Sequence, residues 1–216
     1  MSELTVYLEV FIALYVLVNP LEGIPMFLAR TQGASEELRR AVARTAAFGV
    51  TSILLASLLV GHPLLELLGI SIGAFSVAGG VIIFLIALTM VLGSSGSSKP
   101  ARSPDDGSED LRRFALVPLA TPLLAGPGAI GTVIVYASRG GASGVGELEH
   151  LAVLAGIVFL VGTATWFALR AADPLRELLG DTGIDVSTRI SGILVAAIAV
   201  GMIQQGLVGL FPILGR

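Results

Sequence analysis

The chain has 216 residues, of which 54% are hydrophobic and only 13% are charged, and its mean hydropathy is +0.89. Soluble domains carry about 25% charged residues, so this composition excludes an ordinary soluble fold and favours an integral membrane protein. The net charge of −3 is too small to indicate nucleic acid as a partner, and the lack of cysteine excludes disulfides, thiolate metal sites and a cysteine nucleophile. We expect no metal and no cofactor.

The apolar residues fall into long runs. The N-terminus carries Glu3 and Glu9 and lacks the basic start of a signal peptide, so we interpret the first run as a retained helix. Each run is long enough to cross about 30 Å of hydrocarbon as a helix. The six predicted spans are Leu4–Ala29, Ala41–Val60, Ile72–Leu92, Phe114–Ala137, Leu151–Leu169 and Ile190–Leu210. We therefore predict an all-α integral membrane protein in which residues 1–216 form one domain in the lipid bilayer.

The first span is interrupted by the stretch Asn19–Phe27, NPLEGIPMF. Pro20 and Pro25 each remove a backbone N–H, and Gly23 loosens the backbone between them. The hydrocarbon core holds no water to bind the freed carbonyl and amide groups, so such a break persists only inside protein or beside a wet cavity.

The fourth span repeats this pattern at Thr121–Ile130, TPLLAGPGAI, where Pro122 and Pro127 match Pro20 and Pro25 with one common offset. Two discontinuous helices at corresponding places in two halves indicate the binding site of a transporter.

The internal repeat extends beyond the two breaks. HPLLELLG at 62–69 returns as DPLRELLG at 173–180, and Gly80 and Met90 correspond to Gly192 and Met202. The predicted repeats are residues 1–92 and 112–216, joined by a Gly/Ser/Pro-rich linker at 93–111. Three spans per half invert the second half relative to the first. The alternative is chance similarity between leucine-rich helices.

The basic residues predict the orientation. Eleven lie in the connections after spans one, three and five: Arg30, Arg39, Arg40, Arg44, Lys99, Arg102, Arg112, Arg113, Arg170, Arg176 and Arg189. The other side holds only Arg139 and Arg216. By the positive-inside rule, both termini face outward across the cell membrane.

A broken helix exposes both kinds of backbone group. Its second half presents free N–H groups and a positive dipole end to a carboxylate, and its first half presents carbonyls to an ammonium group or a cation. The predicted ligand is therefore a small zwitterion such as a free amino acid. The alternative is that the prolines only kink packed helices. The candidate site residues are Asn19, Pro20, Glu22, Gly23, Ile24, Pro25, Thr121, Pro122, Ala125, Gly126, Pro127 and Gly128.

Two carboxylates lie within the first span. Glu22 stands in the break itself and is the candidate for binding the ammonium group or for carrying a coupling proton. For Glu9, near the outer end, interfacial exposure is the alternative. No acidic Na⁺ cage is visible, so we favour H⁺ over Na⁺ as the coupling ion.

One motif points elsewhere. Gly141–Gly144, GASG, has the form found in intramembrane serine proteases, and His150 follows it. Ser143 lies in a Gly-rich outward loop, where a turn accounts for it. We expect no enzymatic activity.

Four segments carry a family resemblance: Asn19–Phe27, Val77–Ala87 (VAGGVIIFLIA), Val117–Gly128 (VPLATPLLAGPG) and Arg189–Leu194 (RISGIL). Through them nearly the whole chain resembles the MarC-related family, which includes small neutral amino acid transporters of the SnatA type. The resemblance implies six helices, an inverted repeat and ion-driven transport of glycine, alanine and related amino acids. Carried over, the site comprises Asn19, Pro20, Gly23, Pro25, Pro122, Gly126, Pro127 and Gly128. Glu22 and Thr121 depart from residues that are common in the family.

These observations predict a secondary transporter of small neutral amino acids that works by alternating access of its two halves. Two alternatives remain open: an exporter of other small solutes, as in the similar LysE-type proteins, and a membrane scaffold that transports nothing. The sequence does not decide the direction of transport or the oligomeric state, although one chain already holds both halves.

Overall fold

The computed structural model describes residues 3–93, 111, 113–138, 146–211 and 213. Every regular element in these residues is a helix, which confirms the predicted all-α class. The helices are α1 (Glu3–Val18), α2 (Pro20–Thr31), α3 (Glu36–Leu67), α4 (Ile72–Leu92), η1 (Ala115–Leu124), α6 (Pro127–Ala137), α7 (Glu147–Arg170) and α8 (Ala172–Leu210). Most of the predicted linker, and Ser143 with its motif, lie outside the described residues.

Five stretches of the described chain are helical, long and apolar enough to cross a membrane: Thr5–Thr31, Glu36–Leu67, Ile72–Leu92, Glu147–Arg170 and Thr182–Leu210. The predicted fourth span, 114–137, is instead divided between η1 and α6. Neither piece is long enough to cross alone. This division is the discontinuity that the prolines predict there.

Helix boundaries follow local signals. The Ser35 hydroxyl accepts a hydrogen bond from Leu38 N–H (3.3 Å) and caps α3, as its place before two glutamates predicts. Ser71 caps α4 in the same way, by accepting from Ala74 N–H (3.2 Å). The span predicted at 41–60 is too short, because α3 continues through Pro63 to Leu67.

Two helical segments end in the same way, at a glycine. Gly69 (φ 67°), after α3, and Gly180 (φ 65°), inside α8, both have left-handed backbone. Gly180 divides α8 into a short first helix and the membrane-length helix Thr182–Leu210, so the predicted sixth span begins too late in the chain. Each glycine closes one copy of the P-L-x-E-L-L-G repeat.

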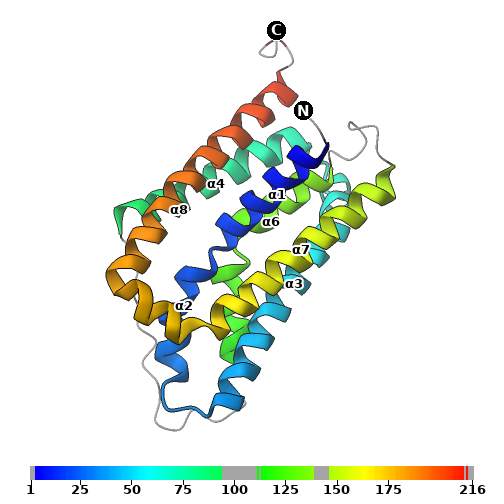
Figure 1. The fold of residues 1–216 in the computed structure, drawn as a ribbon. Helices are drawn as coiled ribbons and strands as arrows, with labels where there is room; N and C mark the ends of the chain where they lie inside the picture. The colour runs from blue at the N-terminus through cyan, green and yellow to red at the C-terminus, as the bar shows by residue number, and fades with distance from the viewer. Residues whose placement is uncertain (1–2, 94–110, 112, 139–145, 212, 214–216) are drawn as a thin grey trace.

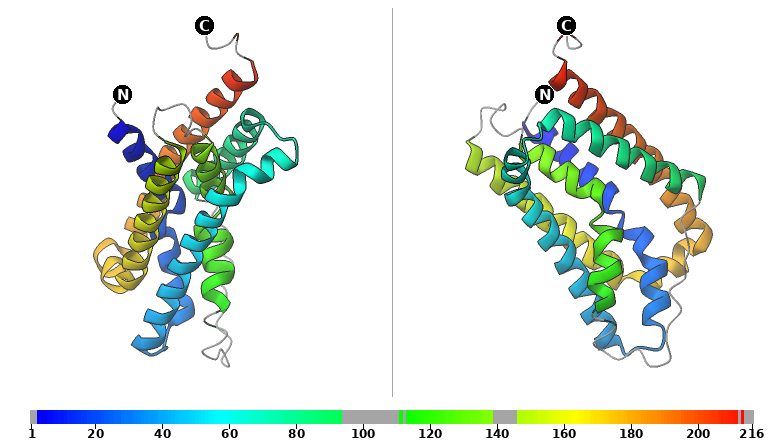
Figure 2. Two further views of the ribbon diagram at one scale, coloured as in Figure 1. Left: turned by 90° about the vertical axis from the view of Figure 1, so that its right-hand side faces the viewer. Right: turned by 180° about the vertical axis from the view of Figure 1, so that it is seen from behind.

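The helices form an elongated bundle in which α1, α2, η1 and α6 occupy the middle (Figure 1). On one flank α4 lies along α8, and on the other α3 lies along α7 (Figure 2). The main hydrophobic core combines side chains of the central helices with those of α3 and α7, and includes Phe27, Leu54, Leu119 and Val161. A second cluster joins α4 and α8 to α6.

The contact between α4 and α8 depends on glycine, as the pair of small residues Gly79 and Gly80 predicts. A Cβ atom on Gly80 would lie 2.7 Å from Ile203 Cγ1 and 2.8 Å from the Ala199 carbonyl oxygen. A Cβ atom on Gly192 would lie 2.9 Å from Val91 Cγ2 and 3.1 Å from the Ala87 carbonyl oxygen. These distances leave no room for a larger residue, so the two helices approach backbone to backbone.

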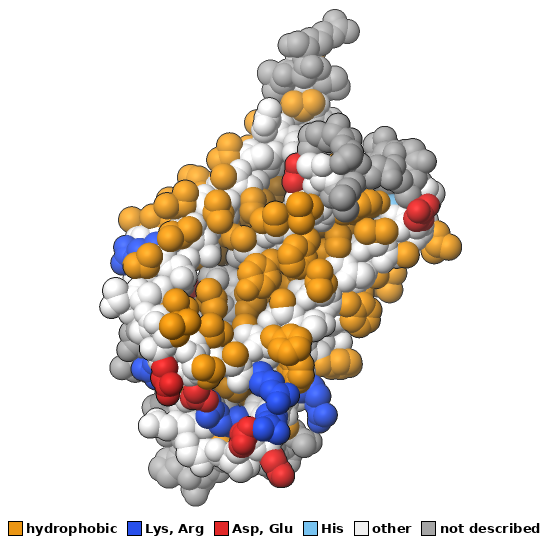
Figure 3. Space-filling view, viewed as in Figure 1, with side chains coloured by type: hydrophobic (Ala, Val, Ile, Leu, Met, Phe, Trp, Pro, Cys, Tyr) orange, Lys and Arg blue, Asp and Glu red, His pale blue; other side chains and the backbone are white. Residues whose placement is uncertain are grey.

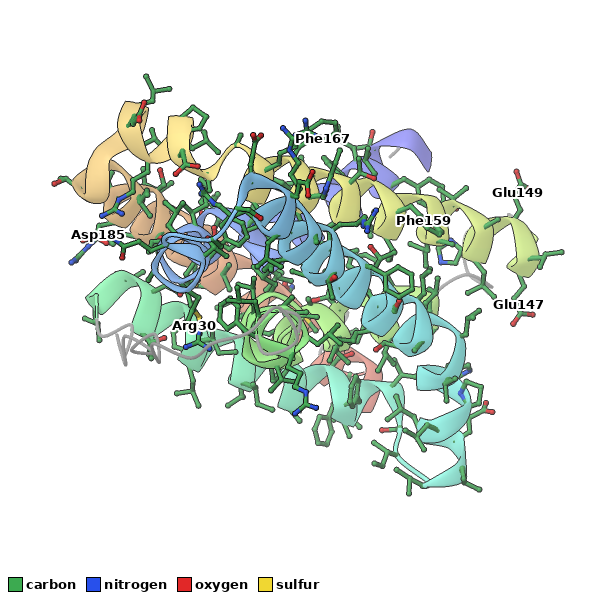
Figure 4. The ribbon with its side chains drawn as sticks, turned by 90° about the horizontal axis from the view of Figure 1, so that it is seen from below. Arg30, Glu147, Glu149, Phe159, Phe167 and Asp185 are labelled. Atoms are coloured by element: carbon green, nitrogen blue, oxygen red, sulfur yellow. The ribbon has the colours of Figure 1, made fainter. Side chains whose placement is uncertain are left out.

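Apolar and charged side chains occupy different parts of the face shown in Figure 3. Hydrophobic side chains cover the middle of the visible face, and charged side chains gather at its lower end (Figure 3). On α7, Phe159 and Phe167 point outward and Glu147 and Glu149 lie at the far end (Figure 4). Both phenylalanines are 57% exposed, as expected for side chains that meet lipid.

Candidate functional site

The first helix break is a single residue. α1 ends at Val18, α2 begins at Pro20, and Asn19 between them has left-handed backbone (φ 40°, ψ 67°). Asparagine is one of the few residues that adopt this conformation at small cost. The predicted break at 19–27 is therefore too long, and Pro25 lies inside α2 rather than before it. Pro20 suits the first position of α2 because the N–H that it lacks has no helical partner there.

Local hydrogen bonds hold this break. Asn19 N–H donates to the Tyr15 carbonyl (3.0 Å), and Glu22 N–H donates to the Asn19 carbonyl (3.1 Å). The Asn19 side-chain amide donates to the Glu22 carboxylate (3.2 Å). Pro20 has no N–H to give to the Val16 carbonyl, so the last turn of α1 presents free acceptor groups at the break.

The second break follows a π-helix. η1 contains Pro118 and Pro122, and its wider turn is seen where Ala125 N–H donates to the Ala120 carbonyl five residues earlier (2.8 Å). The second break was predicted to begin at Thr121, but η1 continues to Leu124. Gly126 is extended, and α6 begins at Pro127, as predicted.

The two breaks lie side by side. A Cβ atom on Gly128 would be 3.3 Å from Leu17 Cδ2, and one on Gly23 would be 3.2 Å from Leu124 Cδ2. The chain segments run in opposite directions, so these two contacts place Asn19 at the level of Gly126. Both breaks lie near the middle of the bundle in all three ribbon views (Figures 1 and 2).

The predicted site residues differ in their surroundings. Asn19, Pro20, Gly23, Ala125 and Gly128 are buried, and Glu22 and Gly126 are half-buried. Ile24 is fully buried in the hydrophobic core, and Pro25 and Pro127 are exposed. Thr121 and Pro122 contribute their backbone to η1, and their side chains lie outside what the structure describes.

Four helix ends meet at this level. α2 and α6 begin here, so the positive dipole ends of these two helices converge from opposite sides. In α6, Ile130 N–H donates to the Gly126 carbonyl (3.1 Å), and the preceding turn starts with a proline. The C-terminal ends of α1 and η1 bring carbonyl oxygens to the same place. The arrangement can bind an anionic and a cationic group together.

Four residues that pack around the breaks were not among the candidate site residues predicted from the sequence. Gly128 packs on Leu17 and on Ile83 of α4, and Gly23 packs on Leu124 and on Leu169 of α7. All four are aliphatic residues in apolar helices. Only the spacing of Leu17, two residues before Asn19, could have pointed to one of them.

The sequence matches the MarC family, described as MarC family integral membrane proteins, over residues 4–211. The chain is 36% identical over 210 residues to UPF0056 membrane protein YhcE of Escherichia coli, covering 97% of this chain and 95% of that protein. It is 38% identical over 208 residues to UPF0056 membrane protein YvbG of Bacillus subtilis, covering 95% and 96%.

An archaeal relative, UPF0056 membrane protein MJ1677 of Methanocaldococcus jannaschii, is 35% identical over 207 residues, covering 96% of this chain and 98% of its own. No solved structure matches the chain. The family match spans nearly all of the sequence, and the relatives are similar over their full length. The chain belongs to the MarC family of integral membrane proteins.

Proposed function

We propose that this protein is a secondary transporter of small neutral amino acids, such as glycine and alanine, with its substrate site at the two helix breaks. The observation that carries the proposal is the meeting of two helix N-termini and two helix C-termini between Asn19 and Gly126. In this role the protein alternates between outward and inward access as its two halves move against each other.

The proposed substrate class follows from the backbone groups at the site. A free amino acid carries a carboxylate and an ammonium group a few ångströms apart. The N-terminal amides of α2 and α6 suit the carboxylate, and the carbonyls that end α1 and η1 suit the ammonium group. Small side chains at Ala125, Gly126 and Gly128 favour a substrate with a small side chain, because backbone can then approach it closely.

The transport mechanism requires two inverted halves of three spans each, and the α4–α8 contact supports this symmetry. Adding 112 to Gly80, Ala87 and Val91 gives the positions of Gly192, Ala199 and Ile203. The contacts of Gly80 with residues 199 and 203 therefore have their counterparts in the contacts of Gly192 with residues 87 and 91. A two-fold axis between α4 and α8 accounts for this exchange.

Transport is tested with purified protein in liposomes, by uptake of labelled glycine and alanine under an imposed pH or Na⁺ gradient. We expect accumulation, and we expect Gly126→Val to abolish it, because the added side chain occupies the space between the helix ends. Gly156→Val is the matched control: Gly156 lies on the exposed face of α7, and nothing stands within 4 Å of a Cβ atom there.

Three results contradict the proposal. Folded protein that accumulates neither amino acid points to a membrane scaffold. Uptake that unrelated solutes compete away points to an exporter of another solute class. Equal uptake by the Gly126→Val and Gly156→Val variants would show that the substrate site is not at the second break.

The proposed coupling ion is H⁺, carried by Glu22, which is the only acidic residue in the breaks. Its carboxylate is half-buried and held by the Asn19 amide. We expect Glu22→Gln to lose accumulation driven by a pH gradient while still exchanging internal for external substrate. Glu37→Gln, at the exposed start of α3, is the control. Unchanged pH-driven uptake in Glu22→Gln would rule out this carrier.

A further inference from the structure

A cavity opens between α1, α6 and α8, away from the helix breaks. It has a volume of about 300 Å³. Its lining combines three polar side chains with apolar ones: Glu9, Tyr136 and Gln205, with Ile12, Ala13, Ile198, Gly201 and Met202. The proposed transport site does not use it. A carboxylate, a phenol and an amide around one space suit a ligand that carries an ammonium group.

The cavity and the breaks are connected along two helix faces. On α1, Glu9 and Ala13 are followed four residues later by Leu17, which packs on Gly128 at the second break. Residues four apart share a helix face. On α6, Tyr136 and Gly128 lie two such steps apart. Asn19 is ten residues from Glu9, about 15 Å along the helix axis at 1.5 Å per residue.

Apolar side chains lie between the cavity and the second break. Met202 is 5% exposed, and its sulfur accepts a hydrogen bond from the Thr132 hydroxyl (3.6 Å). Ile83, which is fully buried, packs on Gly128 at the start of α6. Of these side chains Met202 is the unbranched and flexible one, and it lines the cavity.

We propose that this cavity is the outer vestibule of the transport path and that Glu9 draws the ammonium group of the substrate into it. We further propose that Met202 closes the end of the cavity nearest the helix breaks, which we call its floor. The inference that this vestibule leads to a substrate site rests on the proposed transport function. Three properties of the vestibule can be measured without a transport assay: access to water, preference for cations over anions, and closure by Met202.

The absence of cysteine makes a direct test possible, because single cysteines can be placed in the unaltered chain. Gly201→Cys is the probe, since nothing lies within 4 Å of a Cβ atom at this cavity-lining position. Gly156→Cys has the same free space but lies on the exposed face of α7. The reagents are two water-soluble methanethiosulfonates, one with a trimethylammonium group and one with a sulfonate group, applied to proteoliposomes and followed by intact-protein mass.

We expect Gly201→Cys to react because it lines the cavity, which the reagents enter from water. We expect Gly156→Cys not to react because its exposed face meets lipid, which the water-soluble reagents do not enter. Relative to Ile213→Cys, which lies beyond α8 and is 85% exposed, Gly201→Cys should prefer the cationic reagent by about tenfold. This ratio is the combined effect of a carboxylate about 6 Å away in water, which attracts the cation and repels the anion. Adding Glu9→Gln should remove this preference without stopping the reaction.

The floor has its own test. Thr132→Cys should be unreactive, because Thr132 is fully buried behind Met202, and Met202→Ala in the same chain should make it reactive. No reaction at Gly201→Cys, or a charge preference that survives Glu9→Gln, overturns the vestibule. Reaction as expected in a protein that takes up no amino acid leaves the vestibule standing and refutes the transport function alone.

Discussion

At the scale of single residues, Asn19 decides where the first span breaks. It is the one residue with a side chain that has a positive φ in the described part of the chain. Its side-chain amide also holds Glu22 at the break. One residue thus sets both the backbone turn and the position of the acidic group that we propose as the proton carrier.

Substitution separates these two roles. Asn19→Gly and Asn19→Ala both lose the hydrogen bond to Glu22, but only alanine is strained at φ 40°. We expect Asn19→Ala to lower the free energy of unfolding by about 1–2 kcal/mol more than Asn19→Gly does. Thermal unfolding of the two variants in detergent measures the difference. Equal melting temperatures would mean that the left-handed turn contributes no strain.

At the scale of elements, α4 and α8 approach each other backbone to backbone. Gly80 of α4 and Gly192 of α8 each meet the backbone of the other helix, and neither site can take a methyl group without movement. Packing of this kind replaces the hydrophobic effect, which does not act between helices that already lie in lipid.

We expect Gly80→Ala and Gly192→Ala to destabilise the protein by about 1–3 kcal/mol each, the usual cost of overpacking. Gly80→Ala should cost more, because its Cβ atom would stand 2.8 Å from a backbone oxygen against 3.1 Å for Gly192. Gly156→Ala, with free space around it, should be neutral or stabilising. The measurement is resistance to unfolding in detergent. A Gly156→Ala variant as unstable as the other two would contradict the packing argument.

The η1 segment carries two prolines in a stretch that must still remain helical. Pro118 and Pro122 remove two N–H donors from a span that must still satisfy its carbonyls in lipid. The backbone responds by widening to a π-helix that ends at the second break. π-Helical turns are common at functional sites, in keeping with the proposed role of this segment.

At the scale of the whole molecule, the distribution of charge predicts the orientation in the membrane. The loop between α2 and α3 lies among arginines, and Arg39 at the start of α3 pairs with Asp173 of α8 (2.6 Å). The loop between α3 and α4 lies at the other end of α3, on the side of the N-terminus (Figure 1). The positive-inside rule therefore predicts that the first loop is cytoplasmic and that the second lies outside.

Cysteines at two exposed loop positions test this orientation in intact cells. Ile70→Cys should react with a membrane-impermeant maleimide added outside, whereas Gln32→Cys should react only after the membrane is permeabilised. Both positions are exposed, so a difference in labelling reports sidedness. The reverse pattern would invert the protein and place the vestibule on the cytoplasmic side.

The sequence alone was sufficient for the membrane class, the family, the N-cap of α3, the close contact at Gly80 and the existence of two breaks. These features follow from composition, from local hydrogen bonding and from proline, each of which acts within a few residues. The length of the first break was not predictable in this way. Pro20 and Pro25 look alike in sequence, yet one starts a helix and the other lies within it.

Only the tertiary structure decided which groups meet. Leu17, Ile83 and Met202 are ordinary apolar residues of three different helices, and nothing in their local sequence marks them as neighbours of Gly128 and Thr132. The same holds for the cavity that joins Glu9 to Gln205 across nearly the whole chain. In lipid, hydrophobic pattern distinguishes poorly between a face that meets another helix and a face that meets the bilayer, so the packing of the helices determines the site.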